Sequence, residues 1–139
     1  MTILTAQHGK EIPRAVPSAV SRPFWDGCKR GELCYQRCER CARPNFFPVE
    51  RCRHCLAAEL RWQKSSGQAT LLSWTVVARP AAPAFSVPYV PAVVDLAEGY
   101  QMLTNVIGCE PEDLKAGMRL CVAFHAVDDT LMLPYFRPA

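Results

Sequence analysis

Two cysteine pairs, Cys38-x-x-Cys41 and Cys52-x-x-Cys55, place the strongest constraint on how this chain can fold. Two residues between the cysteines of a pair let both thiolates reach one ion. Two facing pairs complete a tetrahedral four-sulfur site, which suits zinc and leaves no open coordination position for chemistry. The ten residues between the pairs suffice for a hairpin of the compact rubredoxin-like kind. We therefore predict structural zinc as the cofactor, with iron at the same four sulfurs as the alternative.

The cellular compartment decides between a metal site and disulfides for a chain with eight cysteines. The first ten residues lack the basic start and apolar core of a secretory signal, and no apolar run approaches transmembrane length. We therefore expect a cytoplasmic protein without membrane contact, where paired cysteines more often bind metal than form disulfides.

Three segments are predicted along the chain: an N-terminal arm and helix in residues 1–35, a zinc ribbon in residues 36–63, and a barrel in residues 64–139. Half of the residues are apolar, which is enough for a real core. The ribbon alone is too small to sustain a metal-free core, so zinc would have to stabilise it.

A short helix is expected between Ser21 and Gly31, after an extended arm that lies on another part of the molecule. Ser21 can serve as the N-cap, and Gly31 marks the end of the helix. Phe24 and Trp25 either pack on the ribbon or belong to a protein interface, where aromatic side chains are enriched.

Within the ribbon, a strand over residues 33–37 leads into the first cysteine pair. The segment Pro44–Pro48 crosses between the pairs, and its aromatic side chains could cover the metal. His54 lies inside the second pair, and we expect it to be exposed because four cysteines already complete the site. The remaining thiols are predicted to be small buried residues; they are Cys28, Cys34, Cys109 and Cys121.

The second half of the chain alternates apolar and polar residues with period two, which indicates strands. The expected strands are Ala69–Ala78, Ala92–Leu96, Gln101–Ile107, Leu120–His125 and Leu131–Tyr135, with a helical turn near residues 111–115 between the third and the fourth. Three strands, a short helix and two strands is the connectivity of an OB-fold. The fold class is therefore mainly β: a helix, a rubredoxin-like ribbon and a five-stranded OB-fold barrel.

Side-chain directions follow from the same alternation. In the first strand it places Leu72, Trp74 and Val76 together on the apolar face, and in the last strand it places Leu131, Leu133 and Tyr135 together.

The loop between the first two barrel strands, residues 79–91, carries several prolines and is stiff. It cannot pair as a strand. With Arg79 at its base and Phe85 and Tyr89 exposed, it could form a wall against a long, thin, partly apolar ligand. The alternative is a rigid cover over the mouth of the barrel.

No self-sufficient active site is visible in the sequence. There is no glycine-rich nucleotide motif, no histidine–glutamate metal motif and no nucleophile elbow. His125 is predicted to lie on the outward face of a strand. A zinc-stabilised barrel without a catalytic set indicates a binding or scaffolding module, and no catalytic residue is predicted.

Several ordered motifs carry a family resemblance over about residues 20–139. They are the helical segment Pro-Phe-Trp-Asp-Gly to Gly-Glu-Leu (23–33), the two cysteine pairs, Ser-Trp-Thr-Val-Val (73–77), Leu-Thr-Asn-Val-Ile-Gly-Cys (103–109), Asp-Leu-Lys-Ala-Gly-Met (113–118) and Leu-Pro-Tyr-Phe-Arg-Pro (133–138). The chain resembles the acyl-CoA-associated family that joins a rubredoxin-like zinc ribbon to an OB-fold, formerly a domain of unknown function.

The resemblance implies a small subunit that docks on a thiolase-superfamily enzyme, whose large subunit carries the catalytic residues, and that helps enclose an acyl-CoA. Condensation, thiolysis and retro-aldol cleavage all remain open. In that role the basic side chains are candidate phosphate contacts; they are Arg43, Arg51, Arg53, Arg61, Lys64 and Arg79. The proline-rich loop with Phe85 and Tyr89 could then flank the pantetheine arm.

Two other classes of function stay open. One is a nucleic-acid-binding module, because zinc ribbons and OB-folds both occur there, although a net charge of +3 is small for that role. The other is an interaction scaffold without ligand contact.

Overall fold

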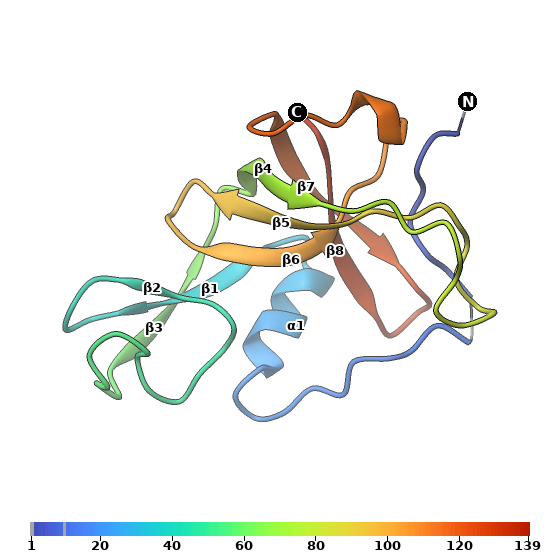
Figure 1. The fold of residues 1–139 in the computed structure, drawn as a ribbon. Helices are drawn as coiled ribbons and strands as arrows, with labels where there is room; N and C mark the ends of the chain where they lie inside the picture. The colour runs from blue at the N-terminus through green and yellow to red at the C-terminus, as the bar shows by residue number, and fades with distance from the viewer. Residues whose placement is uncertain (1, 10) are drawn as a thin grey trace.

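Two antiparallel sheets organise the computed structural model, which describes residues 2–9 and 11–139 (Figure 1). The smaller sheet has the strand order β2-β1-β3 and the larger has the order β6-β5-β4-β7-β8. The elements are α1 (Arg22–Lys29), β1 (Cys34–Cys38), β2 (Pro44–Asn45), β3 (Leu60–Lys64), β4 (Gln68–Trp74), β5 (Pro91–Leu96), β6 (Gln101–Asn105), the 3-10 turn η1 (Pro111–Asp113), β7 (Arg119–Ala126) and β8 (Met132–Pro138). Within the described ranges, no helix has the length and apolar character needed to cross a membrane.

Helix α1 forms where the sequence predicts it, and it packs on both sheets through β1 and β8. Its inner face buries Phe24 and Cys28, and the ring of Phe24 lies 4.9 Å from that of Trp25 and 5.5 Å from that of Phe46. Ser21 occupies the N-cap position, as predicted, but its side chain does not cap the helix. The Ser21 hydroxyl accepts a hydrogen bond from the backbone N–H of Ser18 and makes none to the helix.

The larger sheet has the predicted OB-fold strand order, with η1 between β6 and β7. The side-chain directions in β4 are only partly as expected, because the register with β5 shifts between Leu71 and Ser73. Such a bulge adds one residue and reverses the alternation beyond it. Trp74 therefore lies on the core side with Ala69 and Leu71, whereas Leu72, at the bulge, is 47% exposed. Val76 lies beyond the end of β4 and is 45% exposed.

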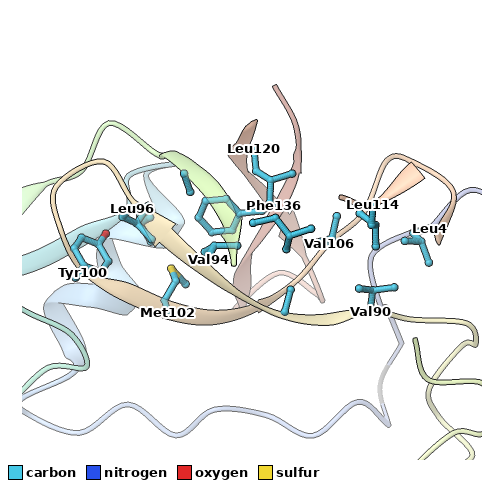
Figure 2. Close-up of a cluster of buried hydrophobic side chains, with 14 of the residues drawn as sticks. Leu4, Val90, Val94, Leu96, Tyr100, Met102, Val106, Leu114, Leu120 and Phe136 are labelled. Carbon is cyan, nitrogen blue, oxygen red and sulfur yellow. The ribbon is translucent and has the colours of Figure 1, made fainter. Parts of the chain in front are cut away.

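Strand β8 closes the sheet through a bridge between Val106 and Phe136. Phe136 is fully buried in the main apolar cluster, which lies inside the curled sheet together with Val94, Val106 and Leu120 (Figure 2). The sequence pattern singled out Leu131, Leu133 and Tyr135 in this strand and missed Phe136. Both faces of β8 are covered at this point, since Tyr135 is also buried.

The N-terminal arm is extended, as predicted, and it is anchored on the barrel. The N–H of Leu4 donates to the carbonyl of Cys109 at 2.8 Å, and the N–H of Gln7 donates to the hydroxyl of Tyr135 at 3.0 Å. The Gln7 side-chain amide exchanges two hydrogen bonds with the backbone of Ser86, in the proline-rich loop. The arm therefore holds that loop against the barrel.

The turn before β4 contains a crowded glycine, Gly67. Gly67 has φ +77°, and a Cβ added there would lie 2.5 Å from Cγ1 of Val122, whose N–H is bonded to the Gly67 carbonyl at 2.8 Å. We expect Gly67→Ala to lower the free energy of unfolding by about 2–4 kcal/mol, from left-handed backbone strain plus overpacking. Gly117→Ala, at φ +81° with open space around it, should cost only about 1–2 kcal/mol. Urea unfolding checks this, and equal losses would contradict the steric argument.

Candidate metal centre and the surfaces beside it

The four paired cysteines converge at the tip of the ribbon. All four Sγ atoms lie within 4.8 Å of one another, and the Cys38–Cys55 and Cys41–Cys52 sulfurs are each 3.6 Å apart. A tetrahedral ion with Zn–S bonds of about 2.3 Å requires sulfurs about 3.8 Å apart, so the observed cluster fits zinc closely.

Each cysteine pair folds as a tight turn, and the two turns are near copies. The N–H groups of Arg40 and His54, each two residues after the first cysteine of its pair, donate to the sulfurs of Cys38 and Cys52, both at 3.4 Å. The residue after each pair, Ala42 or Leu56, has a positive φ of 65° or 66°. Non-glycine residues rarely adopt this conformation. Here the N–H of Ala42 donates to the carbonyl of Cys38 at 2.9 Å, and the N–H of Leu56 donates to the carbonyl of Cys52 at 2.8 Å.

Hydrogen bonds at Cys38 and Cys52 favour the thiolate form that binds metal. At Cys55 the backbone N–H of Ala57 lowers the pKa, but burial and the three neighbouring cysteines raise it to about 11. Burial opposes ionisation of Cys52, but the side-chain amide of Asn45 and the backbone N–H groups of His54 and Cys55 lower its pKa to about 6. For Cys38, the backbone N–H of Cys41 is the main cause of a lowered pKa. A depressed pKa reduces the proton competition that metal binding must overcome.

Asn45 is a supporting residue that sequence reasoning missed. It is fully buried; its Nδ2 contacts the sulfur of Cys52 at 3.5 Å, and its Oδ1 accepts the N–H of Arg53 at 2.9 Å. One side chain thus orients both a ligand and the turn that carries it. The sequence held no specific signal for this role, because asparagine is common in turns whatever its contacts.

The surroundings of the metal centre differ from expectation in one respect. The apolar side chains around the cysteines are Ala57 and Leu60. Phe46 does not cover the metal, because its ring stacks on Tyr100 at 5.2 Å and joins the barrel core. Phe47 is 66% exposed. His54 is exposed, as predicted.

The thiols outside the metal centre behave as small apolar residues. Cys28, Cys34 and Cys109 are buried, and Cys121 is half-buried. Burial raises the pKa of Cys28 to about 12, and it also raises the pKa values of Cys34 and Cys109. Thiols with raised pKa values stay protonated and are poor nucleophiles.

The residues predicted to contact acyl-CoA fall into two separate groups. Arg61 and Lys64 are exposed on β3 of the ribbon, each 3.9 Å from a glutamate, Glu39 and Glu32 respectively. The proline-rich loop, residues 79–91, lies on the opposite side of the barrel (Figure 1).

Within that loop Arg79 is exposed, whereas Phe85 and Tyr89 are half-buried rather than exposed. Phe85 packs in a small cluster with Ile12 and Leu131. The base of the loop also pairs, contrary to expectation, through a bridge between Val77 and Tyr89.

An apolar groove of about 410 Å³ opens between α1, the segment Phe46–Pro48, β6 and the start of β8. Phe24 and Trp25, the predicted interface residues, line it. Phe24 is buried and Trp25 half-buried, so both also pack within the molecule.

The four-sulfur centre on a three-stranded sheet, followed by a curled five-stranded sheet, defines a zinc ribbon joined to an OB-fold. Comparison with known proteins gives the family. The chain belongs to the ChsH2 (DUF35) family: residues 25–61 match the rubredoxin-like zinc ribbon domain of ChsH2, and residues 62–125 match its C-terminal OB-fold domain. The family and fold predicted from the sequence are thereby confirmed, and the cofactor the ribbon suits is structural zinc.

Named relatives and solved structures agree with this membership. The chain is 35% identical, over 84% of its length and 37% of the relative's, to a probable enoyl-CoA hydratase alpha subunit of Thermomonospora curvata. It is 34% identical, over 73% of its length and 35% of the relative's, to the 3-oxo-4,17-pregnadiene-20-carboxyl-CoA hydratase alpha subunit of Mycobacterium tuberculosis. The chain thus spans little more than a third of these two relatives.

Other matches extend over most of the compared chain. A DUF35 domain-containing scaffold protein of Methanocaldococcus jannaschii is 30% identical, with 67% of each chain covered. Among solved structures, a chain of the Ltp2-ChsH2(DUF35) aldolase superposes with a TM-score of 0.83 at 31% identity, covering 90% of this chain and 98% of that one.

Proposed function

We propose that this chain is a non-catalytic accessory subunit that docks on a thiolase-like enzyme and helps enclose an acyl-CoA during C–C bond cleavage or formation. The observation that carries the proposal is the likeness to the Ltp2-ChsH2(DUF35) aldolase chain, which extends over 98% of that chain at a TM-score of 0.83. Two further relatives are named as alpha subunits of hydratases for CoA thioesters.

The chemistry of the chain's own side chains supports a non-catalytic role. Four cysteines fill the coordination shell of the metal, so the metal has no position for a substrate. The buried thiols have raised pKa values. His125 is exposed, with its ring packed edge-on against Tyr135 at 5.8 Å. In this proposal the subunit contributes by ordering the substrate and excluding water, and the bond chemistry occurs on the partner.

Within the complex we propose that the basic side chains of β3 contact the phosphates of the acyl-CoA. Arg61 and Lys64 are suited to this because their carboxylate partners are distant and solvent-exposed ion pairs are weak. The proline-rich loop, with Arg79 at its base, would then contact another part of the ligand or the partner.

The first test is affinity purification of the tagged chain from its own host, followed by native mass spectrometry and metal analysis. We expect a stoichiometric thiolase-like subunit and one zinc per copy of this chain. Purification of the chain alone would contradict the proposal. Co-purification with RNA or DNA would contradict it and also favour the nucleic-acid alternative.

The second test measures CoA-thioester binding to the purified complex. Charge reversal at Arg61 and Lys64 together should weaken binding at least tenfold at low salt, because two phosphate contacts are lost. Arg79→Glu tests the loop separately, and Lys115→Glu, beyond η1, serves as the charge-matched control. Intact assembly with unchanged binding in all variants would support the pure scaffold instead.

A further inference from the structure

Strand β6 forms one end of the larger sheet, and β5 is its one strand partner among the described residues. The N–H of Leu96 donates to the carbonyl of Tyr100 at 2.8 Å, which fixes the phase of this antiparallel ladder. Backbone groups of alternate residues point to opposite sides of a strand. Those of Met102 therefore face β5, whereas those of Gln101 and Leu103 face away from it.

In the part of the chain that the structure describes, no strand pairs with those outward groups of Gln101 and Leu103. Strands β6 and β8 meet at the Val106–Phe136 bridge, where the N–H of Ile107 donates to the Phe136 carbonyl at 2.8 Å. Pro134 then interrupts the pairing, because proline has no N–H to donate. The side-chain hydroxyl of Thr104 donates a hydrogen bond to the carbonyl of Pro134 at 3.1 Å. Past this point, β6 has no strand partner on its outer side among the described residues.

The free edge borders the apolar groove. Among residues 2–9 and 11–139, no charged side chain lines the groove; its walls are mostly apolar and include Phe24, Trp25, Phe46, Met102, Leu103 and Leu133. Two large apolar side chains stand at its rim, Leu103 at 67% and Phe47 at 66% exposure. The Oδ1 of Asn105, also on the groove, is buried without a hydrogen-bond partner.

Sheet edges of this kind are normally protected. Natural proteins place charges, prolines or bulges on an edge strand to prevent pairing with other chains. Strand β6 reads Gln-Met-Leu-Thr-Asn and carries none of these devices. An unprotected edge with an exposed leucine is expected where another strand covers it.

We propose that an extended, uncharged and predominantly apolar segment of the partner subunit adds to β6 as a further strand. Backbone donors and acceptors that recur every second residue are matched by another extended polypeptide, and side chains on one face of that strand would fill the groove. A charged segment would lose its hydration against walls that offer no counter-charge. This inference rests on the proposed function, and it names the surface and the segment that join the two subunits.

The test uses the complex purified with the tagged chain. Leu103→Asp puts a charge on the exposed edge without touching the core, and Leu72→Asp is the matched control on an exposed leucine of β4. We expect Leu103→Asp to weaken assembly at least tenfold and Leu72→Asp to leave it within twofold. In residue-resolved hydrogen exchange, the amides of Gln101 and Leu103 should exchange at least tenfold more slowly in the complex than in the free chain.

Each other outcome overturns the inference. A stable complex whose Gln101 and Leu103 amides exchange as in the free chain would refute it while leaving the proposed function intact. A free chain that self-associates until Leu103→Asp dissociates it would show a second copy on the edge instead. Recovery of no stoichiometric partner would refute the proposed function and this inference together.

Discussion

Replacing Cys52 with serine is expected to abolish stoichiometric zinc binding and unfold the ribbon. Serine keeps the size of the side chain, but its hydroxyl is not ionised at neutral pH and is a poor zinc ligand. Structural zinc supplies roughly 10–16 kcal/mol in finger peptides, and a ribbon of this size has too little core to replace it. Metal analysis, which also separates zinc from iron, and circular dichroism give the readout.

The damage should extend beyond the metal centre, because the ribbon shares aromatic contacts with the barrel. The ring of Tyr35 in β1 stacks on that of Tyr100 at 5.0 Å, and Trp62 of β3 packs against the barrel core. We therefore expect hydrogen exchange in Cys52→Ser to accelerate at Tyr100 as well as in the ribbon. Cys121→Ser, a half-buried thiol outside the metal centre, is the matched control and should keep one zinc. A Cys52→Ser protein with one bound zinc and an unchanged melting temperature would contradict the assignment.

Truncating Phe136 should cause the second large effect, a loss of about 3–5 kcal/mol in the free energy of unfolding for Phe136→Ala. Its side chain has 0% exposure at the centre of the main cluster, and its backbone forms the bridge that closes the barrel (Figure 2). The truncation would leave a cavity between the strands, and the backbone bridge would prevent those strands from moving inward to fill it.

Urea unfolding of the zinc-loaded protein measures this loss, with Phe47→Ala as the control. Phe47 is 66% exposed, and its truncation should change stability by less than about 0.5 kcal/mol. If Phe136→Ala lost less than about 1 kcal/mol, the barrel core would have to be centred elsewhere.

All four cysteines of the metal centre could be predicted from the sequence, because the two cysteines of each pair are close neighbours in the chain. Each pair closes a turn within a few residues, so spacing alone fixes which sulfurs can share an ion. Asn45 was not predictable, since its role depends on the hairpin bringing it beside Cys52, to which it is not adjacent in sequence. The division of the chain into residues 1–35, 36–63 and 64–139 remains a prediction.

The strand order of the barrel was also predictable, because period-two alternation and the helical turn at η1 are visible along the chain. Side-chain directions were less so. The bulge at Leu72 separates Leu72 from Trp74, which were expected on one face, and strict alternation in a sequence does not reveal one extra residue in a strand. Val76 was expected in the same strand, but β4 ends at Trp74. Phe136 was missed because Tyr135 beside it is buried too, under the N-terminal arm.

The sequence by itself determined the zinc ligands, the order of the elements and the family, all of which depend on spacing or periodicity between near neighbours. The tertiary structure alone decided which aromatic side chains unite the ribbon and the barrel, where the arm is anchored, and that β6 keeps an open edge. These features depend on contacts between distant segments: Phe46 against Tyr100, Gln7 against Ser86, and Pro134 facing Thr104. Such contacts arise from packing in three dimensions, which no local pattern encodes.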